Sequence, residues 1–480
     1  MVLVFYNKKT ARINRRKSRI YVDDFSKGIV TSVDKKHLPV NYAVRSFNTA
    51  FKDGALKSGF GIKKAIFEGE KSAIFELEGV SPKAIYYYKK YDESSESYLD
   101  ILMIYADDGN FYKRVLNSED DFMLVQDLSF DKTPSAVTYR YNGKDVIIFS
   151  LENLSKVYDG DSVFYIDDAP AITSTCIHNE RLFATEGGQK TTLWFSDDFN
   201  PLNWSVSLED AGYIDLRDDR GSLLKVVSFD GYLYVFRNYG ITRITAYGDQ
   251  TAFSVDGITA SASRIIPESI CVCGDRIVYL AEDGFYSFSG GTPVRIMEKL
   301  DGLNFSDKST AKAKYYRGNY YCVVTLKNQD DKPFQAIVCY SLKDSGFTIG
   351  NNLNIIDFAV MEGEKEHKLL FICADNRAIG ELSDKSECFS KGIEKTWESG
   401  ESSFGIAKEK ILTKLFISSE SQVKVIVKSE IAKRELSFSG SKRMQVLPVG
   451  LRGENFSFFI QCDVPECYIS YLGAEVEYDG

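Results

Sequence analysis

Histidine is the side chain best suited to moving protons near neutral pH, and this chain has only three. His37, His178 and His367 stand in unrelated contexts, and none belongs to a zinc-binding spacing such as H-E-x-x-H. His178 directly precedes the turn-forming pair Asn179-Glu180, so we expect it at the surface. The chain has no G-x-S-x-G elbow, P-loop or G-x-G-x-x-G phosphate loop. These residues therefore predict neither a catalytic site nor a metal site.

Adjacent carboxylates are a second pattern with chemical potential, because two of them in different surroundings can serve as general acid and base. Here they fall in turn-like sequences, where Asp is favoured for bonding the nearby backbone, and no D-x-D-x-D-G run supports calcium. The segment from Ser196 to Trp204 superficially resembles the Asp-box of sialidases, but it lacks the glycine and has a longer gap. The pairs, which we interpret as turn residues, are Asp107 with Asp108, Asp218 with Asp219, and Asp330 with Asp331. No catalytic residue, cofactor or metal is predicted from them.

Nine cysteines are spread along the chain, mostly inside apolar, strand-like runs. An odd number in such surroundings is typical of reduced core cysteines. Cys271 and Cys273 have the spacing of one strand face, and Cys462 and Cys467 flank a Val-Pro pair where a hairpin would bring them close. A metal site would need two further ligands, and the sequence supplies none near either pair. We therefore interpret them as core cysteines.

Charge is distributed unevenly along the chain. The formal net charge is −9, and subtracting the seven positive charges of the first twenty residues, which hold no acid, leaves −16 on the remainder. Such an acidic body would repel a polyphosphate, which disfavours general nucleic-acid binding. The basic arm is open to three interpretations: contact with nucleic acid, contact with an acidic neighbour, or a solvated tail. Its residues are Lys8, Lys9, Arg12, Arg15, Arg16, Lys17 and Arg19.

The elements that would position these residues are expected to be strands. Aromatic residues make up 13% of the chain, and they fit a half-buried pleated surface. Apolar runs separated by hairpin-type pairs such as Asn142-Gly143 and Asp230-Gly231 recur about every 44 residues, as in four-stranded propeller blades. The copies begin at Pro82, Pro134, Ala171, Leu223, Pro267, Ala311 and Ile355.

This repeat predicts an all-β fold built on a β-propeller of six or seven blades, with seven favoured. A lone blade cannot bury both faces of its sheet, whereas a closed ring can. We expect a basic N-terminal arm and strap over residues 1–80, the propeller over 81–385, and a C-terminal β-sandwich over 386–480, where one face of each strand is polar. The sandwich strands are expected at 411–418, 422–428, 434–438, 444–448, 456–462 and 467–471.

Two stretches are similar to a known family. Residues 23–32, DDFSKGIVTS, and 38–64, LPVNYAVRSFNTAFKDGALKSGFGIKK, resemble the opening of phage head-completion and packaged-DNA stabilisation proteins. A second stretch resembles the central blades of those proteins and of related prophage tail components. It comprises NERLF at 179–183, LWFS at 193–196, PLNW at 201–204, DGYLYVF at 230–236, Gly240-Ile241 and DGFY at 283–286.

The resemblance implies a structural virion protein of a phage, placed in several copies at the neck or tail as a connector, tail hub or channel extension. Its partners would be portal, adaptor or tail proteins and further copies of itself in a ring, with contact between the arm and packaged DNA as an option. No catalytic residue comes with it, and we expect no enzymatic activity. No apolar run approaches the roughly 20 residues that span a membrane, so we expect assembly in the host cytoplasm and residence in the virion.

Two other functions remain open. The first is a glycan-binding or glycan-cleaving propeller that recognises a receptor at the tail tip, with Trp204 and Tyr213 as candidates for stacking on sugar rings. The competing interpretation of these aromatics is that they fill gaps between blades. The second is a cytosolic regulatory propeller that binds peptides, against which the strap and the sandwich argue.

Overall fold

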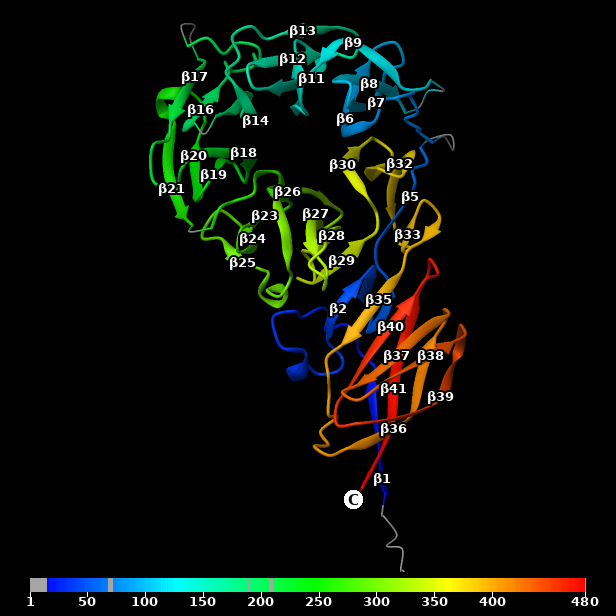
Figure 1. Cartoon of the computed structure of the whole chain (residues 1–480). Coiled ribbons are helices and arrows are strands. Elements are labelled where there is room, and N and C mark those ends of the chain that lie inside the picture. Colours follow the sequence, from blue (N-terminus) through cyan, green and yellow to red (C-terminus); the bar gives the residue numbers. More distant parts are fainter. Residues whose placement is uncertain are drawn as a thin grey trace, which may run out of the picture. The chain divides into compact units, whose positions relative to one another are not determined.

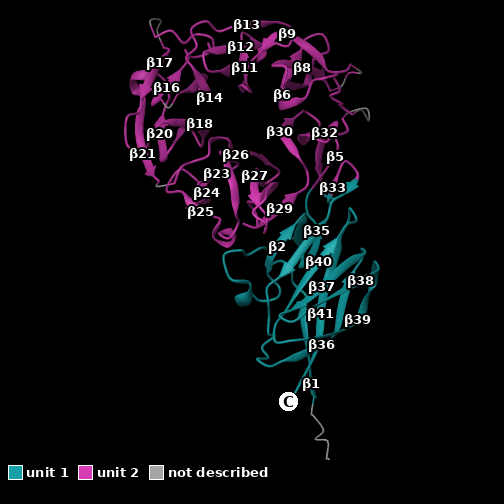
Figure 2. Ribbon diagram, in the orientation of Figure 1, with its two compact units in different colours: residues 1–60, 384–386, 391–480 teal, residues 61–383, 387–390 magenta. Residues whose placement is uncertain are grey.

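The computed structural model describes residues 15–67, 72–116, 118, 120–188, 190–206, 210–261 and 263–479. Its chain divides into two compact units (Figure 2). The ring unit comprises residues 61–383 and 387–390, and the sandwich unit comprises residues 1–60, 384–386 and 391–480. The chain leaves the sandwich unit after residue 60 and returns to it after the ring, so the ring is an insertion between strands of the sandwich.

Seven antiparallel sheets follow one another in the described part of the ring unit, and Figure 1 shows them arranged around a central opening. Six have four strands each, paired in chain order. The first three sheets are β6 (Pro82–Asp92), β7 (Ser97–Ala106), β8 (Asn110–Val115) and β9 (Met123–Ser129); then β10 (Ser135–Tyr141), β11 (Lys144–Leu151), β12 (Leu154–Tyr158) and β13 (Val163–Tyr165); then β14 (Ile172–His178), β15 (Arg181–Glu186), β16 (Thr192–Phe195) and β17 (Gly212–Asp215). The next three are β18 (Leu223–Phe229), β19 (Tyr232–Arg237), β20 (Gly240–Thr245) and β21 (Ser254–Ala260); then β22 (Cys271–Cys273), β23 (Arg276–Ala281), β24 (Gly284–Phe288) and β25 (Val294–Arg295); then β26 (Phe305–Tyr316), β27 (Asn319–Lys327), β28 (Pro333–Ser341) and β29 (Phe347–Asn351). This is a β-propeller arrangement, as the repeat predicts.

The last sheet of the ring includes a strand from the start of the ring unit, which precedes the first sheet in sequence. The first five strands of this sheet, in order, are β30 (Ile355–Glu362), β31 (His367–Cys373), β32 (Asn376–Ser383), β5 (Gly61–Lys64) and β33 (Glu387–Cys388), and β33 runs parallel to β5. β5 pairs antiparallel with β32, with Ile62 opposite Leu382. The Ile62 side chain is fully buried, and its Cγ2 lies 2.3 Å from the position that a Cβ on Gly380 would occupy. Only glycine at 380 lets β5 approach this closely, so the ring closes through a pairing more than 300 residues apart in sequence.

Local sequence signals account for where the ring sheets begin. Sheets start at or within a few residues of the seven predicted repeat starts, the largest difference being β26, which begins six residues before Ala311. The β10–β11 turn at Asn142-Gly143 has φ of 50° and 78°, and the β18–β19 turn at Asp230-Gly231 has 48° and 75°. Two consecutive residues with positive φ match the right-handed twist of the flanking strands. Turn chemistry therefore sets the hairpin positions.

Aromatic side chains join neighbouring sheets of the ring. Tyr88 of β6 and Phe111 of β8 share one buried cluster with Phe149 of β11 in the next sheet, and the Phe111 and Phe149 ring centroids are 4.5 Å apart. Offset and edge-on ring pairs of this kind add about 0.5–1.5 kcal/mol beyond the apolar area they bury. The high Phe and Tyr content is used here, between sheets.

The sandwich unit consists of two antiparallel sheets. One has the order β3 (Thr49–Lys52), β4 (Ala55–Ser58), β41 (Tyr468–Asp479), β36 (Lys410–Ser419) and β39 (Ser441–Gly453), with β1 (Arg15–Val22) also paired to β41. The other has the order β2 (Ala43–Phe47), β35 (Lys395–Ser399), β40 (Phe456–Cys462), β37 (Val423–Ser429) and β38 (Lys433–Phe438). Alternate residues of β37, Val423, Val425 and Val427, are buried, which is the period-two pattern that the sequence predicts. The remaining short elements are β34 (Lys391–Gly392) and the 3-10 helices η1 (Lys35–His37), η2 (Gln250–Ala252), η3 (Pro267–Ser269) and η4 (Glu298–Leu300).

The N-terminal segment differs from its prediction. Residues 1–80 are not a separate arm and strap: within the described residues, four of their strands belong to the sandwich and β5 belongs to the ring. The boundaries expected at residues 80 and 385 therefore become two crossings, near residue 60 and between residues 383 and 391. The physical reason is that short strands such as β2 and β5 pair with partners far away in sequence, β35 and β32, which leaves no local repeat to detect. No helix in the described ranges is long and apolar enough to cross a membrane.

Candidate functional site

The basic arm is in part a strand of the sandwich. Arg15, Arg16, Lys17 and Arg19 lie on β1, paired with β41, whereas Lys8, Lys9 and Arg12 lie outside the described residues. Lys17 and Arg19 stand directly opposite Glu477 and Glu475, at 2.8 and 3.3 Å between the charged atoms, and Arg15 lies 3.9 Å from Glu477. Opposite charges at directly facing positions stabilise an antiparallel pair. The described half of the arm therefore meets an acidic strand of its own chain.

The ion pairs between β1 and β41 shift pKa values on both strands. A hydrogen bond from Lys17 to Glu477 raises the pKa of Lys17, and one from Arg19 to Glu475 raises the pKa of Arg19. Burial would raise the pKa of Glu475, but the hydrogen bond from Arg19 and the charge of Lys414 outweigh it, so that pKa is lowered. The sequence shows the basic cluster, but the acids that meet it lie about 460 residues away and carry no local mark of the pairing.

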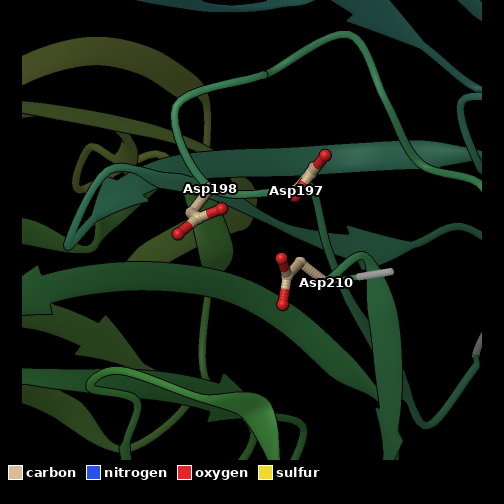
Figure 3. Close-up of side chains that lie close together, drawn as sticks. All are labelled: Asp197, Asp198 and Asp210. Carbon is tan, nitrogen blue, oxygen red and sulfur yellow. The ribbon is translucent and has the colours of Figure 1, made fainter. Parts of the chain in front are cut away.

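Three carboxylates gather on the connection between β16 and β17. Oxygens of Asp197, Asp198 and Asp210 lie within 4.8 Å of one another (Figure 3). The buried Arg181 guanidinium lies 4.0 Å from Asp198 and 3.9 Å from Asp210, and it donates to the backbone oxygens of Ser196 and Asp210 at 3.1 and 2.7 Å. This cation offsets part of the negative charge, and Asp197 accepts from the Asn203 side-chain amide at 3.1 Å, so the cluster holds the connection in place and we assign no ligand to it. The sequence shows Asp197 and Asp198 in a segment that superficially resembles the Asp-box of sialidases, but it does not indicate their meeting with Asp210.

The two aromatic residues proposed for glycan stacking differ in their exposure to solvent. Trp204 is 2% exposed and its Nε1 donates to the Pro201 oxygen at 3.0 Å, so it is unable to stack on a sugar. Its ring belongs to a buried cluster shared with the preceding sheet, which corrects its assignment as a contact residue. Tyr213 on β17 is 53% exposed and packs against Trp194, with ring centroids 5.1 Å apart. Alternating burial along a strand is set by which sheet covers it, which the local sequence does not reveal.

A cavity of about 590 Å³ lies between the β6–β9 and β10–β13 sheets, within the usual size range of small-ligand pockets. The Tyr165 ring is 56% exposed at this cavity. Lys156 is buried, donates to the Asp127 and Ser129 oxygens at 2.8 and 3.0 Å, and lies 5.2 Å from the Tyr165 ring centroid. The chemically distinctive lining residues are Tyr105, Asp107, Asp108, Asp131, Lys156 and Tyr165. Sequence reasoning missed this pocket, because its residues come from four separated segments, 105–110, 129–131, 154–156 and 165.

The acids of the cavity are held as turn residues, as the sequence predicts for Asp107 and Asp108. Asp107 accepts from the Ser81 backbone N–H at 2.8 Å, and Asp108 accepts from the Asn110 backbone N–H at 3.1 Å and from the Tyr112 hydroxyl at 2.7 Å. Burial opposes ionisation of Asp108, but the hydrogen bonds from Asn110 and Tyr112 prevail and lower its pKa. Burial and the bond to Asp108 raise the pKa of Tyr112 to about 12. The carboxylate is therefore an anionic acceptor and not a poised general acid.

The innermost strands carry a mixed charge cluster. Figure 1 shows β18, β26 and β30 beside the central opening. Lys312 of β26 lies 3.1 Å from Asp357 of β30, and Lys225 of β18 lies 3.8 Å from Glu268 of η3. Lys225, followed by the other nearby lysines, lowers the pKa of Glu268. Carboxylates of the same chain thus partly neutralise these lysines. The lysines would therefore attract a polyphosphate less strongly than a basic lining without nearby acids.

His178 is buried, which corrects the expectation of a surface residue. It ends β14, and its Nδ1 lies 2.8 Å from the Ser228 hydroxyl on β18 of the next sheet. The Asn179 side-chain amide donates to Nε2 at 3.1 Å, so the network assigns the proton to Nδ1. The turn at Asn179-Glu180 is present, with both residues at positive φ, but the neighbouring sheet covers the histidine before it. Burial lowers the pKa of His178.

His178 therefore predicts a pH dependence of stability. Below its ordinary pKa of about 6.5 the unfolded chain takes up a proton that the folded chain does not, so stability is present above that pH and falls as the pH drops. We expect the free energy of unfolding of the ring to decrease between about pH 7 and about pH 5.5, and His178→Gln to flatten this slope. Urea unfolding at both pH values measures it, with the exposed His367→Gln as control. An unchanged slope in His178→Gln would contradict the assignment.

No protein-family model and no curated protein matches the sequence of this chain. Solved structures with similar folds include BBS1N in complex with ARL6DN, which is 9% identical, covers 65% of this chain and 97% of that chain, and has a TM-score of 0.41. The WD40 domain of Neurospora crassa Pan2 is 9% identical over 65% of this chain and 97% of its own, with a TM-score of 0.35. Kluyveromyces lactis Hsv2 is 8% identical over 52% and 81%, with a TM-score of 0.30. At these identities and TM-scores the likeness adds no argument, and the β-propeller fold of the chain rests on the order of the sheets in its own ring unit.

Proposed function

We propose that this chain is a structural component of a phage particle. It takes a place at the neck or tail as a connector, tail hub or channel extension, held by contacts with portal, adaptor or tail proteins and with further copies of itself. It carries out no catalytic step, it assembles in the host cytoplasm, and its final location is the virion. The resemblance of residues 23–32 and 38–64 to head-completion proteins supports the particle, and the architecture supports the structural role.

The observation that carries the structural role is the insertion of a closed ring between strands of a sandwich. Residues from both ends of the described chain pair in one sheet, where β1 lies against β41, and β5 closes the ring against β32. Counting each ring sheet as a blade gives seven blades. The chain passes between the units after residue 60 and again within residues 383–391. A component that carries mechanical force between neighbouring proteins benefits from such closure. Neither end of the ring segment is free, because the chain continues at both ends into the sandwich unit.

The test is assembly in the producing phage. A strain lacking this chain is expected to yield heads without attached, functional tails, and electron microscopy of particles carrying a labelled chain should place the label at the neck or tail. Particles that assemble and infect normally without the chain would overturn the proposal. Assembly of several copies of the chain through many weak contacts is a separate measurement. Sedimentation of the purified chain over a range of concentrations gives the mass of that assembly.

The arm is expected to contribute through its charges. Deleting residues 1–14, which contain Lys8, Lys9 and Arg12 and leave β1 intact, should lower the yield of particles and make that yield less sensitive to salt. A matched control is Lys27→Ala, which removes one exposed lysine outside β1. An arm-deleted chain that joins particles with unchanged yield and salt response would leave the arm without this role.

The cavity favours a second candidate function, recognition of a glycan receptor. An exposed tyrosine ring beside several carboxylate acceptors suits a sugar, which offers an apolar face and hydroxyl donors. We expect Tyr165→Ala to weaken binding of any glycan found by array screening at least tenfold, with Tyr213→Ala testing the site considered first. Tyr247→Ala, which removes an even more exposed ring outside the cavity, should leave affinity unchanged. If the purified protein saturates with no glycan, this candidate fails while the structural role is untouched.

A further inference from the structure

A hairpin joins the last two strands, β40 and β41, which are labelled in Figure 1. Cys462 is the final residue of β40, and Cys467 directly precedes β41, so four residues separate them across the turn. Both are buried, at 2% and 7% exposure. Contacts with other segments fix the turn: Cys467 N–H donates to Ser58 Oγ at 2.7 Å, and the Pro465 oxygen accepts from Ser386 N–H at 3.0 Å. The fold therefore holds two buried cysteines at the two ends of one fixed turn.

A buried lysine stands beside this pair. Lys395 of β35 is directly opposite Cys462 in the ladder between β35 and β40, and it is 1% exposed. Its ammonium donates to the Ile393 oxygen at 3.0 Å, and no ion pair between it and a carboxylate of the described residues is present. A buried cation is costly unless an anion accompanies it. Among the groups that act on the charge of Lys395, Cys462 has the largest effect, followed by Cys467 and Asp463.

We propose that Cys462 and Cys467 are an oxidation site that forms a reversible intrachain disulfide with peroxide as the oxidant. Cys462 is the attacking sulfur: its thiolate takes oxygen from hydrogen peroxide, the O–O bond breaks, and hydroxide leaves and is protonated to water. The thiol of Cys467 then attacks the resulting sulfenic acid, loses its proton and releases a second water as the S–S bond forms. Two thiols and one peroxide thus become one disulfide and two waters. A small oxidant is required, because both sulfurs are buried.

The electrostatics agree with this order of events. The hydrogen bond from Cys467 and the charge of Lys395 outweigh burial and lower the pKa of Cys462 to about 7. The same interaction with Cys462, followed by burial, raises the pKa of Cys467. One thiolate near neutral pH and one thiol as resolving partner is the arrangement that a peroxide-sensitive pair requires. Burial lowers the pKa of Lys395, and ionised Cys462 counteracts that effect.

The chain contains its own comparison pair. Cys271 and Cys273 lie on one strand, β22, two residues apart. Extended backbone separates such residues by about 6.7 Å, at the limit of the spacing that a disulfide tolerates. Cys462 and Cys467 flank a turn and have no such restriction. We therefore expect oxidation of the hairpin pair and not of the strand pair.

The experiment treats the full chain with limiting hydrogen peroxide, alkylates the remaining thiols and cleaves after glutamate. Glu466 lies between the two cysteines, so the disulfide appears as two linked peptides, 455–466 and 467–475, which a reductant separates. We expect this linked pair in the wild type and in Cys271→Ser, and its loss in Cys467→Ser. Finding both hairpin cysteines alkylated, or oxidised only to acids, in folded wild-type protein would overturn the proposal without any variant.

The role of Lys395 has a separate readout. The rate of peroxide consumption should rise with pH through a midpoint near 7 in the wild type, and in Lys395→Met the midpoint should move toward the value of about 8.5 for a free cysteine. At about pH 7 this makes oxidation several-fold slower. An identical pH profile in Lys395→Met would remove the lysine from the site. Closing the short loop should also raise the melting temperature of the sandwich unit by a few degrees.

Discussion

Replacing Ile62 by Asp is expected to open the ring. Ile62 is fully buried on β5, opposite Leu382 of β32, and its backbone oxygen accepts from the Phe389 N–H at 2.7 Å. An aspartate there loses the burial of the isoleucine and places an unpaired charge in the closing sheet, so we expect a cost of about 4 kcal/mol or more. Because β5 is the only strand that joins the start of the described ring to its last sheet, the loss should be felt along that whole sheet.

Urea unfolding followed by hydrogen exchange of peptides from β31 and β32 measures this effect. The matched control is Lys64→Ala, which changes an exposed residue of the same strand and should alter stability by less than about 0.5 kcal/mol. If Ile62→Asp left the exchange of β32 peptides at the wild-type rate, β5 would have no closing role. A second variant, Gly380→Val, approaches the same contact from the other side, where a Cβ would fall 2.3 Å from the Ile62 methyl carbon.

Arg237→Met is expected to produce the second large loss of stability. Arg237 ends β19 and is fully buried. Its NH2 group donates to the Leu216 and Gly221 oxygens at 2.7 and 2.6 Å, and its NH1 group lies 2.8 Å from an oxygen of Asp218. Methionine fills similar space but leaves the Leu216 and Gly221 oxygens without their donor, whereas the part-exposed Asp218 keeps Arg220 at 2.9 Å. Each acceptor left unsatisfied by such a change costs about 1–3 kcal/mol, so we expect a loss of about 2–4 kcal/mol.

The same connection provides the control for this variant. Arg217 pairs with Asp215 at 2.6 Å, but its side chain is 79% exposed. Exposed pairs contribute about 0–1 kcal/mol, so Arg217→Ala should be close to neutral. Chemical denaturation of both variants, with hydrogen exchange of peptides covering residues 216–221, separates them. Equal stabilities of the two variants would mean that Arg237 does not hold this connection. The interaction of Arg237 with Asp218, which contributes to the lowered pKa of Asp218, would then add nothing to the stability of the fold.

Arg181 and Arg237 show why acidic pairs in this chain are poor indicators of catalysis. Each arginine is buried at one end of a second strand and holds the carbonyl oxygens and carboxylates of a following connection. The acids that the sequence places in pairs are thus used as local acceptors and counter-charges. This agrees with the turn interpretation of Asp218, and it explains how Asp210, a residue without any pattern of its own, joins Asp197 and Asp198.

By itself the sequence determined the repeating hairpins, the seven places where ring sheets begin, and the strands of the C-terminal half of the sandwich. These features are written locally, because turn residues with positive φ and period-two burial are properties of a few neighbouring residues. The basic cluster and the short spacing of Cys462 and Cys467 were likewise visible, although the sequence led us to interpret these two only as core cysteines.

Only the tertiary structure decided which strands closed the ring, which acids met the arm, and which aromatics stayed exposed. β5 and β1 find partners hundreds of residues away, and such pairings are stabilised by complementary surfaces that leave no mark in the local sequence. For the same reason Trp204 proved to be core and Tyr165, a residue without a motif, borders a cavity. Burial is a property of what a neighbouring sheet covers, and that neighbour is chosen by the fold.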